Sequence, residues 1–291
     1  MQKKSSLIRG LLLICACLTA DVSLAQDLSD VFDKIEAPWL RREGSESEKR
    51  EEEPIETDRD SFTPATNTVD RGRTIYESSY SFIENRNTTN DHSFPEIITR
   101  FGITERLEFR LGWNFESGGG GDVSNGDPGG LEEEPGSRQE SQMLYGIKYA
   151  ITKQRGWIPQ SATIIQATTP TSGPDNFTDL NVGYIAGWKF FNNWQLDSAI
   201  RYTATREKED HFNQWAPSVV LKVPVGERWA AHTEYFGIFS DGKATGSNRQ
   251  YVSPGIHYLV TPNCEIGIRV GWGLNQDSAN FFSNVGLGLG F

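Results

Sequence analysis

The stretch SNVGLGLGF, residues 283–291, closes the sequence on a strict alternation of side chains. Val285, Leu287, Leu289 and Phe291 would lie on one face of a β-strand, and glycines would leave the other face bare. The last residues of a domain usually fray unless the fold ties them down. A strand that runs to the final aromatic residue therefore needs a partner on both sides, and a closed barrel provides two partners for every strand.

The same alternation recurs through most of the chain. In LEFRLGWNF (107–115), LNVGYIAGWKF (180–190) and EIGIRVGWGL (265–274), apolar residues alternate with residues that are mostly polar or glycine. These runs approach the roughly 9–11 residues that a tilted strand needs to cross a bilayer. We expect about twelve strands, at 73–84, 92–102, 107–116, 142–151, 161–169, 179–190, 194–204, 213–224, 229–239, 251–260, 264–274 and 282–291.

The connections between these runs sort by length. Those after the even-numbered runs are mostly short: ITER (103–106), FNN (191–193), VGER (225–228) and TPN (261–263), with 152–160 the longest. Those after the odd-numbered runs are longer and polar: NRNTTND (85–91), REKEDHFN (206–213), SDGKATGSNR (240–249) and the Gly-rich acidic stretch 117–141. Short turns at one end, long loops at the other and an even strand number indicate an all-β, up-and-down antiparallel barrel of the outer membrane.

The N-terminus has the pattern of an export signal. Lys3, Lys4 and Arg9 precede the apolar run 10–20, and a small-x-small site ends at Ala25. We predict a signal peptide over 1–25. A retained anchor and a lipoprotein acylated at Cys17 are the alternatives.

Residues 26–72 form an acidic region that includes the charge run EGSESEKREEEPIETDRD (43–60). Such a composition favours a largely disordered periplasmic leader. Docking a periplasmic partner or plugging the lumen are the other roles open to it. The barrel itself is expected over 73–291.

Composition excludes several classes of protein. The net charge is −11, and loss of the signal's three basic residues and one acidic residue makes it −13, so a nucleic-acid binder is not expected. Cys264 would remain as the single cysteine, which rules out an internal disulfide. Beyond residue 25 no apolar run approaches about 18 residues, and a mean hydropathy of −0.51 suits a barrel in which alternate residues face lipid.

Charged residues fall regularly on the face opposite the apolar one. An Arg or Lys on the lipid face costs about 2–4 kcal/mol at the bilayer midplane, so this register predicts that they line the lumen. A polar conduit and a salt-bridged, closed filling both fit such an interior, and the glycines of 264–274 and 282–291 favour space beside that wall. The predicted lumen-lining residues are Glu77, Glu96, Arg100, Glu108, Arg110, Lys148, Lys189, Asp197, Arg201, Lys222, Glu234, Glu265 and Arg269.

Two partners follow from a barrel in the outer membrane. Trp113, Trp188, Trp194 and Trp229 lie near strand ends, as in the aromatic belts that contact lipid headgroups. The terminal Phe291 resembles the signal by which the barrel-assembly machinery recognises its clients.

Enzymatic and metal-binding interpretations are weaker. His232 lies two residues from Glu234 and could act as a base with an orienting carboxylate, but such a pair is more often structural. The spacing of Asp122, Asp127 and Glu132 to Glu134 fits no calcium-loop pattern. We therefore predict no catalytic, cofactor-binding or metal-binding residue.

The segments ETDRDSFTP (56–64) and FGITERLEFRLGW (101–113), with Glu77 between them, resemble the family described as "Putative MetA-pathway of phenol degradation". The resemblance runs from about Glu56 to Phe291. The family tends to have Asp-Arg-Pro-Asp where this chain has Asp58-Arg59-Asp60-Ser61. The resemblance implies an outer-membrane barrel that transports small solutes, hydrophobic or aromatic ones among them. A non-transporting structural or binding barrel is the alternative.

Overall fold

The computed structural model describes residues 54–59, 61–86, 89–118, 138–173, 176–207, 210–242 and 248–291. All of them belong to the second of two compact units, residues 48–291. The predicted signal peptide, most of the predicted leader and the acidic residues considered for calcium lie outside the described residues.

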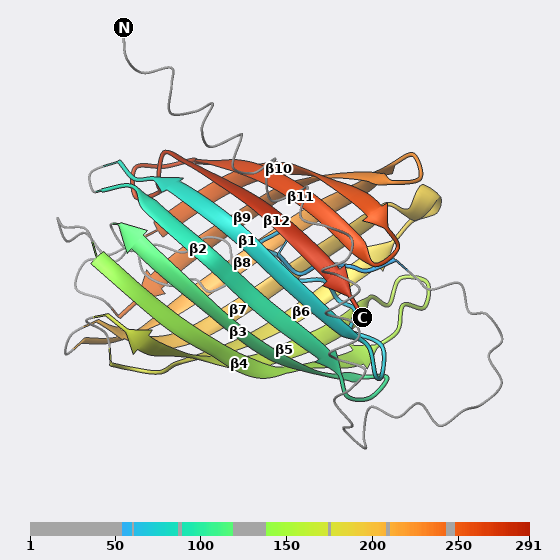
Figure 1. Cartoon of the computed structure of the whole chain (residues 1–291), viewed down its shortest axis with the longest axis horizontal. Helices are drawn as coiled ribbons and strands as arrows, with labels where there is room; N and C mark the ends of the chain where they lie inside the picture. Colours follow the sequence, from blue (N-terminus) through green and yellow to red (C-terminus); the bar gives the residue numbers. More distant parts are fainter. Residues whose placement is uncertain are drawn as a thin grey trace, which may run out of the picture. The chain divides into compact units, whose positions relative to one another are not determined.

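Twelve antiparallel strands make up the described structure, which confirms the predicted number (Figure 1). A short 3₁₀ turn, Phe191–Asn193, joins β6 to β7. The strands are β1 (Thr74–Glu84), β2 (Asp91–Gly102), β3 (Leu107–Gly118), β4 (Arg138–Thr152), β5 (Gln160–Ser172), β6 (Asp179–Lys189), β7 (Gln195–Glu207), β8 (Asp210–Val225), β9 (Trp229–Asp241), β10 (Asn248–Thr261), β11 (Cys264–Gly273) and β12 (Phe281–Gly290).

The last strand closes the sheet into a barrel. β12 pairs with β11 and also with β1, in a register that runs from Ile75 opposite Gly290 to Glu84 opposite Phe281. Beyond the strand, Phe291 and Thr74 exchange two backbone hydrogen bonds of 2.9 and 3.1 Å. The alternating stretch at the end of the sequence is therefore paired on both sides, as predicted.

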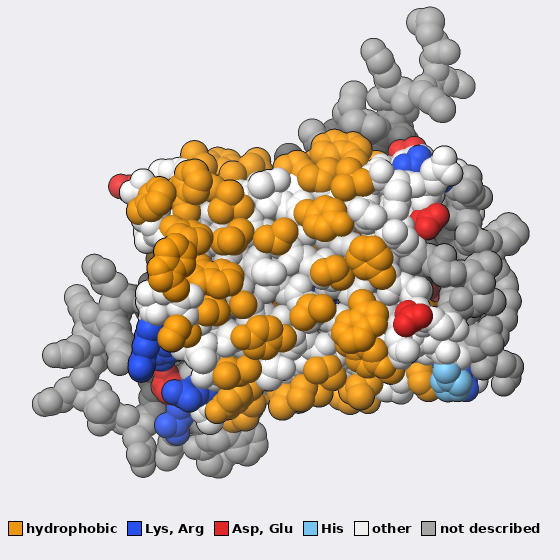
Figure 2. All heavy atoms as spheres, turned by 180° about the vertical axis from the view of Figure 1, so that it is seen from behind, with side chains coloured by type: hydrophobic (Ala, Val, Ile, Leu, Met, Phe, Trp, Pro, Cys, Tyr) orange, Lys and Arg blue, Asp and Glu red, His pale blue; other side chains and the backbone are white. Residues whose placement is uncertain are grey.

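Outward and inward side chains differ as the alternation predicts. Leu111, Tyr184, Ile268 and Val285 are exposed on the outer face. Figure 2 shows hydrophobic side chains spread over the outer surface, with the charged side chains near its two ends. Among the described residues, no helix has the length and apolar character to cross a membrane.

One predicted loop is wrong. Residues 206–213 are almost entirely strand, because β7 continues to Glu207 and β8 begins at Asp210, with Arg206 opposite His211. The ladder of this hairpin continues past the apolar part of both strands. There neither face needs to be apolar, so the sequence carries no alternation that would mark a strand.

Most of the described residues of 54–73 are buried, so this segment is not an exposed leader. Ile55 donates its backbone N–H to Pro262 in the turn between β10 and β11, and the described residues from 57 to 66 are buried inside the barrel. The segment leads back to β1 through a bond from Gly72 to the carbonyl of Gly102 (Figure 1, blue coil). We call residues 54–73 the plug. Of the roles considered for 26–72, a solvated leader does not hold for this part, whose sequence continues the preceding charge run.

The register can be tested by placing the same side chain at two depths. Leu111 lies in the middle of β3 on the outer face, and Ile103 lies in the turn that precedes β3; both are exposed. Leu111→Arg should lower the yield of folded protein, since the cost is about 2–4 kcal/mol at midplane, whereas Ile103→Arg should cost only about 0–1 kcal/mol near the interface. Heat-modifiable migration on a gel measures the folded band. Equal yields from the two variants would contradict the register.

Candidate functional site: the plugged lumen

Ten of the thirteen residues predicted to line the lumen are buried: Glu77, Glu96, Arg100, Glu108, Arg110, Lys148, Asp197, Arg201, Glu234 and Arg269. The side chains of Lys222 and Glu265 are mostly buried, at 14% and 16% exposed. Lys189 differs, because it is the last residue of β6 and is exposed at the strand end. The inward register thus gathers acidic and basic side chains around the plug.

Asp58 of the plug lies among three cations of the wall. Its Oδ2 is 2.5 Å from Nη1 of Arg110, 3.2 Å from Nζ of Lys148 and 3.7 Å from Nε of Arg100. Its Oδ1 accepts a hydrogen bond from the backbone N–H of Ala65, which folds the plug back on itself. Charges buried in this way are stable only when paired, so Asp58 is the electrostatic anchor of the plug.

Carboxylates of the wall accept hydrogen bonds from the backbone N–H groups of the plug. Glu77 accepts the N–H groups of Asp58 and Arg59, at 2.9 and 3.0 Å. Glu234 accepts those of Phe62 and Thr63, at 2.9 and 2.7 Å, and the Thr63 hydroxyl at 2.7 Å.

A third carboxylate, that of Glu108, accepts the N–H of Val69 at 2.9 Å. An irregular chain inside a barrel has no ladder of its own, and buried N–H groups without partners are costly. The inward acids supply those partners.

Arg59 adds an ion pair of opposite polarity. Its Nη1 lies 3.1 Å from Oε2 of Glu96 and 2.5 Å from the Ser79 hydroxyl. Plug and wall therefore form ion pairs of both polarities: an acid of the plug pairs with cations of the wall, and a base of the plug pairs with an acid of the wall.

The inner-face glycines are contact points for the plug. A Cβ at Gly288 would lie 2.4 Å from Cγ2 of Thr57, and one at Gly290 would lie 2.6 Å from Cγ2 of Ile55. At Gly102 a Cβ would lie 1.9 Å from the carbonyl oxygen of Asp70. The glycines of β11 and β12 predicted free space beside this wall, but the plug fills the space beside Gly288 and Gly290.

Aromatic residues that were not among the predicted lumen-lining residues also line the lumen beside the plug. Phe62 of the plug stacks on Phe236 of β9 with ring centroids 4.1 Å apart, and Phe236 stacks on Tyr251 of β10 at 4.9 Å. Phe282 of β12 lies edge-on to Tyr251 at 5.9 Å. All four rings are buried. Their inward register follows from that of Glu234, His257 and Asn284 on the same strands, but their apolar character points to the lipid face.

His232 and Glu234, which were considered as a base with an orienting carboxylate, have other partners. His232 Nδ1 lies 2.7 Å from Nε2 of His257, and the two rings stack. Glu234 binds the plug, as described above.

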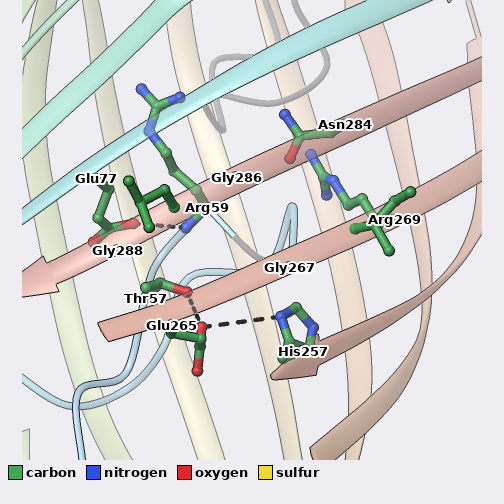
Figure 3. Close-up of a pocket in the computed structure, with 12 residues that line it drawn as sticks. Thr57, Arg59, Glu77, His257, Glu265, Gly267, Arg269, Asn284, Gly286 and Gly288 are labelled. Carbon is green, nitrogen blue, oxygen red and sulfur yellow. Dashed lines mark hydrogen bonds and ion pairs between the residues drawn. The ribbon is translucent and has the colours of Figure 1, made fainter. Parts of the chain in front are cut away.

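A cavity of about 20 Å³ lies between the plug and the wall of β10, β11 and β12, with Thr57, His257 and Glu265 among its lining residues (Figure 3). It has room for about one water molecule. In Figure 3 Glu265 links the plug's Thr57 to His257.

A closed, twelve-stranded antiparallel barrel with an apolar exterior and a charged interior is a β-barrel of the outer-membrane type. The sequence model of the family described as "Putative MetA-pathway of phenol degradation" matches residues 57–291, and the chain belongs to that family. This confirms the resemblance seen in the sequence. A search of curated proteins found no match.

Solved structures with a similar fold include two outer-membrane barrels. The COG4313 outer membrane channel from Pseudomonas putida F1 aligns over 78% of this chain and 98% of its own, with a TM-score of 0.54 and 11% identity. The NanC porin aligns over 74% of this chain and 98% of its own, with a TM-score of 0.50 and 9% identity. At these identities the likeness establishes the barrel architecture.

The fit between plug and glycine wall can be tested with two alanine variants. Gly102→Ala should displace the plug, because its Cβ would overlap the backbone of Asp70. Gly286→Ala is the matched control, since its Cβ would meet nothing closer than 3.6 Å. The reporter is a cysteine in place of the buried Thr66, in a Cys264→Ser background.

The rate of thiol labelling of the folded protein should rise in Gly102→Ala and stay unchanged in Gly286→Ala. Slow labelling of both variants would mean that the plug does not rely on this contact.

Proposed function

We propose that this protein is an outer-membrane channel for small solutes, closed in this conformation by residues 54–73, and that it conducts when the plug leaves the lumen. The buried contact of Asp58 with Arg100, Arg110 and Lys148 is the observation that carries the proposal. It holds the plug by charge inside a wall that becomes hydrated once the plug is gone.

The way the plug is attached supports its release. The segment is tied to the turn at Pro262 near its start and runs into β1 at its end, so both its ends lie at the short-turn end of the barrel. A loop whose two ends both lie at the same end of the barrel can be withdrawn from the lumen without unthreading the chain or breaking the β-ladder. The contacts described above that Asp58, Arg59 and the plug backbone make with the wall are ion pairs and hydrogen bonds, which water can replace.

The inward charges suit a passage for polar or amphipathic molecules. Arg100 pairs with Glu77 and Glu108, and Arg110 pairs with Glu108, so acids and bases of the wall lie side by side. Such a lumen would select only weakly by charge. The proposed role is passive, with export by the N-terminal signal and no chemical step.

The anchor can be tested by exchanging one carboxylate for an amide. Asp58→Asn removes the partner of three buried cations, and breaking a buried pair in this way costs about 3–5 kcal/mol. The equilibrium between docked and released plug should shift by about 10² to 4 × 10³-fold toward release. Single-channel recording in a planar bilayer should show rare openings for the wild type and frequent or sustained openings for Asp58→Asn.

Glu56→Gln is the matched control. It makes the same chemical change in the plug, but the Glu56 side chain is 27% exposed and lies 3.6 Å from Lys222, so the loss should be small. Its openings should be as rare as those of the wild type. If neither wild type nor Asp58→Asn carries current at any voltage while both fold, the barrel is a closed structural or binding protein.

A further inference from the structure

The ring of Phe62 occupies a site formed by wall residues of four strands. Phe236 stacks on it, and the guanidinium carbon of Arg201 lies 3.9 Å from its centroid. Tyr251 and Phe282 pack behind Phe236. These residues face inward on strands whose other inward residues are mostly polar, so the aromatic cluster is a local departure from the character of the wall.

The same wall residues bind the backbone of Phe62. Nη2 of Arg201 donates to the Phe62 carbonyl oxygen at 3.0 Å, so one guanidinium contacts both ring and carbonyl. On the other side, Glu234 accepts the Phe62 N–H and the two donors of Thr63. The wall therefore recognises a flat ring, an acceptor and a set of three donors at fixed relative positions.

We propose that this is a binding site for a free aromatic α-amino acid, which Phe62 occupies when the plug is docked. The inference rests on the proposed release of the plug. Ring, carboxylate and ammonium of such a molecule are joined by the same carbon skeleton as ring, carbonyl and N–H of Phe62. The carboxylate pairs with Arg201, and the ammonium supplies three donors to Glu234.

When the plug is released, the wall residues of this site lose the contacts that Phe62 and Thr63 made with them. The ring of Phe236 loses the stacked ring of Phe62, and Glu234 loses its three donors from the plug. An aromatic amino acid restores both the stacking and the charge-assisted hydrogen bonds. Because ligand and docked plug exclude each other, the ligand must stabilise the released state.

The test measures plug release as a function of ligand. The full chain carries Thr66→Cys in the Cys264→Ser background, folded in detergent, and the labelling rate of the new thiol is followed. L-phenylalanine should raise this rate in a saturable manner.

Two control ligands each remove one recognised feature. 3-Cyclohexyl-L-alanine has the same charges without an aromatic face, and should need about 3- to 10-fold higher concentrations for the same effect. 3-Phenylpropanoate keeps ring and carboxylate but lacks the ammonium, and should need about 10-fold more or fail altogether.

Two variants assign the effect to this site. Phe236→Leu removes the stacking partner and should narrow the difference between L-phenylalanine and its cyclohexyl analogue, leaving only the preference that Arg201 gives to an aromatic ring. Phe62→Leu weakens the binding of the plug to this site and leaves the wall intact. The half-maximal concentration of L-phenylalanine should therefore fall. The second variant keeps the test decisive if the first does not fold.

The outcomes separate this inference from the proposed function. A labelling rate that no ligand changes, or equal responses to all three ligands, overturns the aromatic amino acid site even where the channel conducts. A selective response without any bilayer current supports the site and overturns the conducting role, because labelling requires no current.

Discussion

Buried backbone groups must find hydrogen-bond partners, and this constraint governs the interior of the barrel. The wall satisfies itself through its ladder, including the closing pair of β1 and β12. The plug has no ladder, so Glu77, Glu108 and Glu234 receive its N–H groups. Those acids are in turn neutralised by neighbouring bases, since Arg100 pairs with both Glu77 and Glu108, and Arg269 with Glu234. The inward charges thus hold an irregular segment inside a membrane-spanning wall.

Shape and charge specify the plug together. Gly102, Gly288 and Gly290 let it approach the wall, while Asp58 and Arg59 fix its depth by ion pairs of opposite sign. Charged contacts make the docked state specific without making it permanent, because water in an open lumen can hydrate the same groups. A plug held by a large apolar core would lack this property. The apolar contribution centres on Phe62, and at that residue the wall also has the features of a ligand site.

Much of the barrel could be predicted from the sequence, because the lipid requires an apolar side chain at every second residue of a strand. Leu111, Tyr184 and Val285 belong to such alternating runs. The same assignment of apolar residues to the lipid face gives a wrong orientation for some aromatic residues of the lumen. Phe236, Tyr251 and Phe282 face inward, in register with Glu234, His257 and Asn284, yet an apolar side chain in a predicted membrane strand points by default to lipid. The docking of the plug could not be predicted from the sequence for another reason. Its acidic and basic residues continue the charge run before it, and the ion-pair partners of Asp58 and Arg59 lie 37 to 90 residues further along the chain.

The most direct test of the account is the single-channel current of a chain that lacks residues 54–69 but keeps its N-terminal signal and complete barrel. If the plug closes an otherwise continuous passage, this protein should fold and show a steady open current with weak ion preference, while the full chain opens rarely. A folded, plug-less barrel that carries no current would show that the wall itself closes the lumen, and would contradict the central claim.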